Sequence, residues 1–446
     1  MPLSRLIKLL LRSLLALLIS SPFVVLLLAL QSERLVPANA PLSAMELNEV
    51  EQLLLESAPQ STLTASSREL QLSSEELNLL QRYGFQVMGL LPQWSGELDL
   101  QQDLVSALLS IQIDIGPLPI FLNMQGNFTN DDTGIHLRDL RLGNLQLPNP
   151  VMDYAVSRIQ NNLLTADVGF DDFLELLDNV EAVQLTPGQV ALTMLWEPRL
   201  MDRLAYRAQQ IFVPLEDRER ILDYYQVTKD IVSTIPVDLR AVSLNTFLVA
   251  MFNEARDRSS ISGDPVAENR AALQALSVYV NNEDIAQLVG QELAANVEPA
   301  PFIEVRLRRR QDLAQHLVSI AAITASAGAG FAQMLSNTKE AYDARYRTGF
   351  SFSDMTANTV GVLLASHATR NPASAAELQA RITNMESESD FMPEVGNSRD
   401  GISEADFGVI YRDRNSTEYA ARMTEIRNLI EGLPLFQGLE PLAIDQ

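Results

Sequence analysis

The order of apolar and polar positions along the chain divides it into an apolar run, a strand-rich part and a helix-rich part. Residues 13–32 carry no charge and are mostly apolar, and about 20 such residues suffice to cross a bilayer. Between about residues 69 and 197, short alternating runs separated by turn residues predict half-buried strands. From about residue 198 on, apolar residues recur three and four positions apart, which indicates packed helices.

This pattern predicts an α+β fold, in which a small antiparallel-sheet domain precedes a larger, mostly α-helical domain. Two apolar runs around Pro187-Gly188 predict a hairpin in the first domain. Proline, serine and threonine residues around a short amphipathic segment, residues 45–55, are typical of a solvated stalk. The expected parts are a transmembrane anchor or signal segment at 1–32, a stalk at 33–68, an α+β domain at 69–197 and a helical domain at 198–446.

Charges on the two sides of the apolar run predict its orientation. Arg5, Lys8 and Arg12 precede the run and acidic residues follow it, so we expect the N-terminus in the cytoplasm and the bulk outside. The favoured interpretation is a retained anchor, which makes the chain a single-pass inner-membrane protein with its bulk in the periplasm. The alternative is a cleaved signal peptide, because residues 38–40 read Ala-Asn-Ala, although Pro41 follows directly. Expected partners are the membrane, through the N-terminal helix, and a lipid or another envelope component.

Composition and charge exclude several classes of function. The formal net charge is −24 and the one dense basic cluster, residues 306–310, is short, so nucleic acid is not an expected partner. The chain has no cysteine, which excludes disulfides, thiol chemistry and thiolate zinc sites. It has no Walker loop, no H-E-x-x-H motif and no nucleophile elbow, which disfavours the standard nucleotide enzymes and hydrolases.

Three pairs of polar residues at helical spacing make residues 312–361 the candidate site. The pairs are Asp312 and His316, Glu340 and Asp343, and Asp354 and Asn358. Residues three or four positions apart share one face of a helix, so each pair is expected to point in one direction. The uncharged, small-residue segment 317–338 predicts a buried helix that neighbours approach closely, with a second membrane span as the alternative. Such packing would present all six side chains to a common cleft.

These residues resemble two related families. The blocks are Asp312-x3-His316, then Lys339-Glu340-x2-Asp343, then Phe350-Ser351-x2-Asp354-x3-Asn358-x2-Gly361. Their order and spacing resemble those of YfiM-type periplasmic lipoproteins and VanZ-like membrane proteins, although Leu313 stands where the lipoproteins have lysine. The resemblance implies an envelope context and a site, without a particular reaction. In the first domain, residues 141–152 and 183–196 are similar to membrane-anchored domains of the YpmS kind, which implies an antiparallel domain holding an apolar ligand.

Two interpretations of the six polar residues follow. In the first they form a site: Asp312 would fix the tautomer of His316, and the six side chains would hold a hard cation of unknown identity. Within that interpretation, His316, Glu340 and Asp354 could instead be acid–base catalysts acting on an envelope lipid or glycan. In the second they form a buried network that ties helices together, and the protein has a binding or scaffolding role. His136, on an expected strand, is interpreted as structural, and His367 as a cation favoured by a helix C-terminus.

Overall fold

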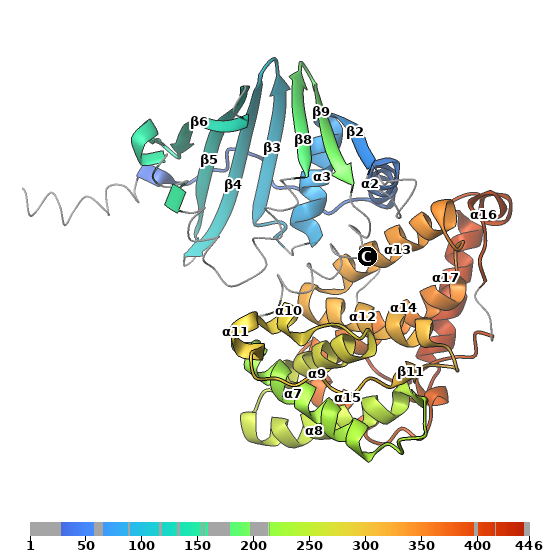
Figure 1. The fold of residues 1–446 in the computed structure, drawn as a ribbon. Helices are drawn as coiled ribbons and strands as arrows, with labels where there is room; N and C mark the ends of the chain where they lie inside the picture. Colours follow the sequence, from blue (N-terminus) through green and yellow to red (C-terminus); the bar gives the residue numbers. More distant parts are fainter. Residues whose placement is uncertain are drawn as a thin grey trace, which may run out of the picture. The chain divides into compact units, whose positions relative to one another are not determined.

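The computed structural model describes residues 28–57, 66–87, 90–115, 118–131, 134–152, 154, 157–158, 179–196, 213, 215–396, 400–414 and 416–440 (Figure 1). The described chain forms two compact units, one built around antiparallel sheets and one built from helices. The predicted fold class is confirmed in this form. Residues 1–27, which hold most of the expected anchor, lie outside the described residues. Among those that are described, no helix combines the length and apolarity needed to cross a membrane.

The described residues of the first unit form two antiparallel sheets and helical segments, and the helix at residues 44–57 belongs to this unit only as far as Val50. The larger sheet has the order β3-β4-β5-β6-β7, with β1 on β5, and the smaller has the order β2-β9-β8. The strands are β1 (Leu30–Gln31), β2 (Ser66–Ser73), β3 (Trp94–Gln101), β4 (Leu104–Ile115), β5 (Leu118–Asp131), β6 (Gly134–Leu142), β7 (Leu145–Gln146), β8 (Val180–Thr186) and β9 (Gln189–Trp196), and the helices are α2 (Ala44–Ser57) and α3 (Ser74–Val87). The expected hairpin around Pro187-Gly188 is formed by β8 and β9.

Register separates the larger sheet into an apolar and a polar face. Leu109 on β4 lies opposite Met124 on β5, and residues so paired point to the same side of a sheet. One residue further along, Ser110 lies opposite Asn123, so both point to the other side. The alternation predicted from the sequence is therefore the alternation between these two faces.

The residues expected to begin a stalk pack on the polar face instead. The backbone N–H groups of Leu35 and Val36 donate to Ser110 Oγ at 3.0 and 2.9 Å, and that of Leu35 also donates to Asn123 Oδ1. Val36 is buried, and Arg34 donates to the side chain of Gln112 at 2.6 Å. Because β1 comes directly before this segment and consists of Leu30 and Gln31, the chain joins the sheet within the last residues of the apolar run.

We expect Ser110→Ala to lower the free energy of unfolding of the first unit by about 1 to 2 kcal/mol, because it removes the acceptor of the buried Val36 N–H and one of the two acceptors of the Leu35 N–H. Urea titration followed by circular dichroism would measure the loss. Ser106→Ala is the matched control, since Ser106 lies on the same face of β4 four residues earlier and no described residue hydrogen-bonds its hydroxyl. Equal stability of the two variants would contradict docking of the 33–36 segment.

The second unit consists of helices with one short parallel strand pair. Its elements are α7 (Leu215–Thr234), β10 (Ala241–Ser243), α8 (Leu244–Ser262), α9 (Pro265–Val280), α10 (Ile285–Val289), α11 (Gln291–Ala294), β11 (Glu304–Arg306), α12 (Gln311–Ala327), α13 (Ala329–Tyr346), α14 (Phe352–Thr369), α15 (Pro372–Ile382), η1 (Glu388–Asp390), α16 (Glu404–Tyr411) and α17 (Thr417–Glu431). Gly263 ends α8 in the left-handed conformation, and Asp264 caps α9 with Pro265 in its first turn.

Three buried helices, α9, α12 and α14, pack against one another at the centre of the second unit (Figure 1). Nearly all residues of α9 are buried, so it packs on all sides. The buried-helix interpretation of residues 317–338 is confirmed for α12, but the segment forms two helices rather than one. Gly328 separates them with φ +89°, a conformation that favours glycine. The expected core position of Tyr224 is also confirmed, and its hydroxyl donates to Glu268 Oε2 at 2.8 Å.

An aromatic cluster fixes the start of α14 against α16 and α17. The ring of Phe350 lies 4.8 Å from that of Phe407 and 4.9 Å from that of Phe352. The rings of Tyr411 and Tyr419 also contact Phe352. Aromatic pairs at these distances contribute about 0.5 to 1.5 kcal/mol each to stability beyond the effect of burial. The cluster therefore fixes the beginning of α14 against α16 and α17.

Candidate functional site

The third block of the motif is a single stripe along α14. Ser351, Asp354, Asn358 and Gly361 are three, four and three positions apart, which places them on one helix face. Ser351 is the N-cap, and its hydroxyl accepts from the N–H of Asp354 at 3.2 Å. The other three positions face α12: Asp354 and Asn358 contact a histidine there, and Gly361 lies against the α12 backbone. The spacing of Asp354, Asn358 and Gly361 in the sequence therefore corresponds to the contact of α14 with α12.

His316 on α12 lies between Asn358 and Asp354. Its Nδ1 is 3.1 Å from Asn358 Oδ1, and its Nε2 is 3.4 Å from Asp354 Oδ2. The amide of Asn358 is oriented by Ser336, since its Nδ2 donates to Ser336 Oγ at 2.7 Å. Asn358 Oδ1 must then accept from the ring, which places a proton on Nδ1. A neutral imidazole held this way directs the lone pair of Nε2 towards Asp354.

Glu340 on α13 completes the group. It is fully buried, and its Oε2 accepts from the backbone N–H of Ser351 at 3.2 Å. One potential ligand atom each from His316, Glu340 and Asp354 lies within 4.8 Å of the other two. The sequence hypothesis that an imidazole and two acidic side chains from separate blocks meet in space thus agrees with the geometry.

The remaining residues of the hypothesis lie at the edge of this group. Asp312 bonds to Arg310 at 2.6 Å, and Asn358 is the partner of His316 Nδ1, the tautomer-fixing position expected for Asp312. Asp343 pairs with Lys339 at 3.3 Å and with Arg347 at 3.9 Å. The six residues therefore divide into two sets. His316, Glu340, Asp354 and Asn358 form the central set, and the carboxylates of Asp312 and Asp343 lie at its edge.

Arg310 is a member of the site that sequence reasoning missed. Its guanidinium donates to Asp354 Oδ1 at 3.0 Å and to Ser353 Oγ at 2.8 Å, besides Asp312, and the side chain is only 9% exposed. Burial alone would lower the pKa of Arg310, but the hydrogen bond and charge of Asp312 outweigh it and raise that pKa above the usual value. In the other direction, burial would raise the pKa of Asp312, but Arg310 lowers it. The signal was present as the basic cluster 306–310 directly before the first block.

A strained turn delivers Arg310 to the site. Residues Leu307 and Arg310 exchange backbone hydrogen bonds of 2.8 and 2.9 Å, so Arg308 and Arg309 form a two-residue turn. Both have positive φ, +51° and +65°, which is uncommon for residues with a side chain. Arg308 secures the turn through a 3.1 Å bond from its Nε to the carbonyl of Met392. Non-glycine strain of this kind concentrates at functional sites, although it does not define one.

Carboxylates outnumber cationic side chains around the central group. The carboxylates in the connected network are Asp312, Glu340, Asp343, Asp354 and Asp400, and the cations are Arg310, Lys339 and Arg347. Acidic side chains thus predominate among these described contacts, which suits a cation as ligand.

The other two histidines belong to other parts of the chain. His136 is on β6 opposite Thr129, as expected for a strand residue. His367 is in the last turn of α14, but the prediction that it is a cation is wrong. Burial, followed by the charge of Arg370, lowers the pKa of His367 below its usual value, so its imidazole is neutral at pH 7.

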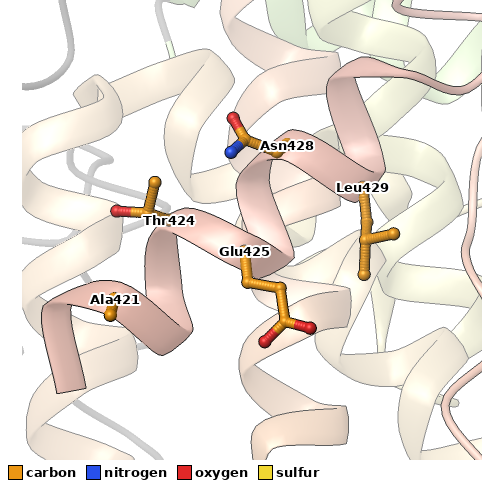
Figure 2. Close-up of a pocket in the computed structure, with 5 residues that line it drawn as sticks. All are labelled: Ala421, Thr424, Glu425, Asn428 and Leu429. Carbon is orange, nitrogen blue, oxygen red and sulfur yellow. The ribbon is translucent and has the colours of Figure 1, made fainter. Parts of the chain in front are cut away.

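A hollow on the surface of α17 involves different residues (Figure 2). Its described lining residues are Ala421, Thr424, Glu425, Asn428 and Leu429, which follow one another along a single helix. Its one carboxylate, Glu425, pairs with Arg422 at 2.6 Å. The described lining of the hollow thus brings together no set of ionisable side chains from separate helices, as the group around His316 does. The group around His316 is therefore the stronger candidate site, although it lies between packed helices.

Comparison of the chain with protein-family models, with curated proteins and with solved structures finds no match. The resemblances to YfiM-type, VanZ-like and YpmS-like proteins stay predictions. The function is therefore inferred from the geometry of the site.

Proposed function

We propose that the protein is a membrane-tethered envelope protein whose helical unit binds a divalent cation through His316, Glu340 and Asp354. The observation that carries this proposal is that each of the three groups is oriented by a partner on another of its atoms. Asn358 holds His316 Nδ1, Arg310 holds Asp354 Oδ1, and the Ser351 N–H holds Glu340 Oε2. Partners of this type are what orient the ligands of metal sites.

The distances suit a small cation. Zinc–nitrogen and zinc–oxygen bonds of about 2.0 to 2.2 Å in a tetrahedron separate neighbouring ligand atoms by about 3.4 Å. His316 Nε2 and Asp354 Oδ2 are already 3.4 Å apart. The third ligand atom lies within 4.8 Å of both, so a small rotation of the Glu340 carboxylate would complete three protein ligands. Imidazole with two carboxylates is a ligand set for zinc, cobalt or manganese rather than for calcium.

The test is a titration of the purified full-length protein, in detergent, with Co²⁺ followed by visible absorption and with Zn²⁺ followed by calorimetry. We expect one equivalent of each to bind. His316→Ala should abolish binding, and Asn358→Ala should weaken it by about 10- to 100-fold, as loss of an orienting partner does. His136→Gln, which alters a histidine in the other unit, is the control and should bind as the parent does. A parent protein that binds neither ion would leave only a structural network at this place.

The second candidate is acid–base catalysis on an envelope lipid or glycan by His316, Glu340 and Asp354. It is favoured by one observation: His316 is the most exposed of the three, with 11% of its side chain accessible, and its Nε2 is not used to fix its tautomer. The two candidates differ in one measurement. Activity of the cation-free protein on envelope lipid extracts, lost in His316→Ala without loss of fold, would favour catalysis.

The tether is proposed from the apolar run and its flanking charges. It gains support from the docking of residues 33–36 on the first sheet, because cleavage after Ala40 would remove β1 and the buried Val36. We expect the mature protein to keep these residues, to pellet with membranes and to be released by detergent but not by high salt. N-terminal sequencing of the mature chain and protease protection of spheroplasts would check this. A mature N-terminus at Pro41 would contradict it.

A further inference from the structure

Lys339 places a positive charge beside the proposed ligand atom of His316. Its Nζ lies 3.5 Å from His316 Nε2 and 3.3 Å from Asp343 Oδ2, one helical turn further along α13. A cation bound at Nε2 would be repelled by the Lys339 ammonium group at this distance, because both carry positive charge. Without a cation, the ammonium group can donate to Nε2, so binding of a cation would leave this ammonium group in need of an anionic partner.

The type of residue at this position is itself unusual for the chain. Of its 33 lysine and arginine residues only three are lysines, which are Lys8, Lys229 and Lys339. Arginine therefore takes nearly every structural ion pair, as it does at Arg310. Lysine differs from arginine in presenting a compact charge with three donors on a flexible stem, which suits a point contact with an anionic group.

The proposed cation site opens towards Lys339. Glu340 and Asp354 approach from inside the unit with no accessible surface, whereas the Lys339 side chain is 45% exposed and that of His316 is 11% exposed. A cation with three protein ligands keeps at least one coordination position for water or an external ligand. Because protein side chains fill the buried side, this position must face the solvent side, where Lys339 lies.

We propose that the site takes an anionic oxygen ligand, a carboxylate or a phosphate group, that bridges the bound cation and the Lys339 ammonium group. The proposal rests on the cation site proposed above. An anion placed between the two positive charges is attracted by both, and Asp343 keeps the ammonium group over the site until the ligand arrives. Free phosphate and the headgroup of an anionic lipid share this chemistry, and the test separates them.

The experiment uses full-length protein in detergent, loaded with Co²⁺. Acetate, methyl phosphate and short-chain phosphatidic acid are added in turn, and the visible Co²⁺ spectrum reports entry of an oxygen ligand. We expect saturable spectral changes in the parent and at least a tenfold weaker anion affinity in Lys339→Met, with Co²⁺ affinity in anion-free buffer unchanged or increased. Lys229→Met, a lysine of α7, is the control and should behave as the parent. Tighter binding of phosphatidic acid than of methyl phosphate would identify a lipid headgroup as the source, and equal binding a free anion.

The outcomes separate the two proposals. If the parent binds no Co²⁺, the cation site is wrong and the anion site with it. If Co²⁺ binds but anions leave its spectrum unchanged, or Lys339→Met binds them as tightly as the parent, the anion proposal alone is overturned. Weaker Co²⁺ binding by Lys339→Met in anion-free buffer would also overturn it, because Lys339 would then support the ligands structurally.

Discussion

Gly361→Ala should lower the free energy of unfolding of the helical unit by about 3 kcal/mol, at the upper end of what overpacking a buried contact costs. A Cβ at this position would lie 2.5 Å from the carbonyl oxygen of Leu317 and 3.2 Å from the backbone nitrogen of Ala321. Neither is the end of a flexible side chain, so α12 and α14 would have to move apart. Chemical denaturation followed by circular dichroism would measure the loss.

The same substitution should also weaken the proposed cation site. Gly361 lies three residues beyond Asn358 on the stripe that faces α12, so separation of the two helices pulls Asn358 and Asp354 away from His316. Gly408→Ala is the matched control, because Gly408 lies inside α16 and a Cβ there would meet nothing within 4 Å. It should stabilise the protein by up to about 1 kcal/mol, the difference in helix propensity between the two residues. A stabilising effect of Gly361→Ala would contradict the close approach.

Glu283→Gln should stabilise the protein at pH 8 by about 2 to 3 kcal/mol and leave it nearly unchanged at pH 4.5. Glu283 lies between α9 and α10, and its Oε2 is buried without a hydrogen-bond partner among the described residues. Burial raises the pKa of Glu283 to about 7 from its ordinary value of 4.5. A buried carboxylate without a partner is costly in its charged form, so the folded protein prefers this group protonated.

The sign follows from proton binding. Between pH 4.5 and 7 the folded chain holds a proton on Glu283 that the unfolded chain has released. The free energy of unfolding must therefore fall as pH rises through this interval, and it stays at the lower value above it. Glutamine does not titrate, so the variant loses this part of the pH dependence. Denaturation at pH 4.5, 6 and 8 would measure it, with Glu292→Gln, an exposed glutamate of α11, as control. Parallel pH profiles for parent and Glu283→Gln would contradict an unpaired buried carboxylate.

The main division of the fold could be predicted because it depends on local pattern. Alternation of period two and recurrence of period 3.6 distinguish strands from helices, and the two units follow that division. The position of α9 at the centre of the helical unit could not be predicted, because burial on all sides leaves no polar face to orient the helix. The docking of residues 33–36 on the sheet could not be predicted from the sequence. Its hydrogen bonds are donated by backbone N–H groups, which every residue type except proline has.

The candidate site could be predicted in part. The spacing within each block states which side chains share a helix face, and so the stripe on α14 was recognisable. The contacts between blocks were a hypothesis only, because spacing within one helix says nothing of which helix it faces. Arg310 was missed since its role depends on a turn with two positive φ values, formed by arginines rather than by the residues that usually mark such turns.

The sequence by itself thus determined the kinds of element, their order, and the side chains that each helix face carries, since these depend on interactions between near neighbours in the chain. Only the tertiary structure decided that α12, α13 and α14 bring His316, Glu340 and Asp354 together, with Asn358 rather than Asp312 fixing the imidazole. The physical reason is that helix packing selects one rotation and one separation of each pair. Here Gly361 has no side chain and so allows α14 to approach α12 closely. The sequence alone could not show this, because the close contact is with the backbone of another helix.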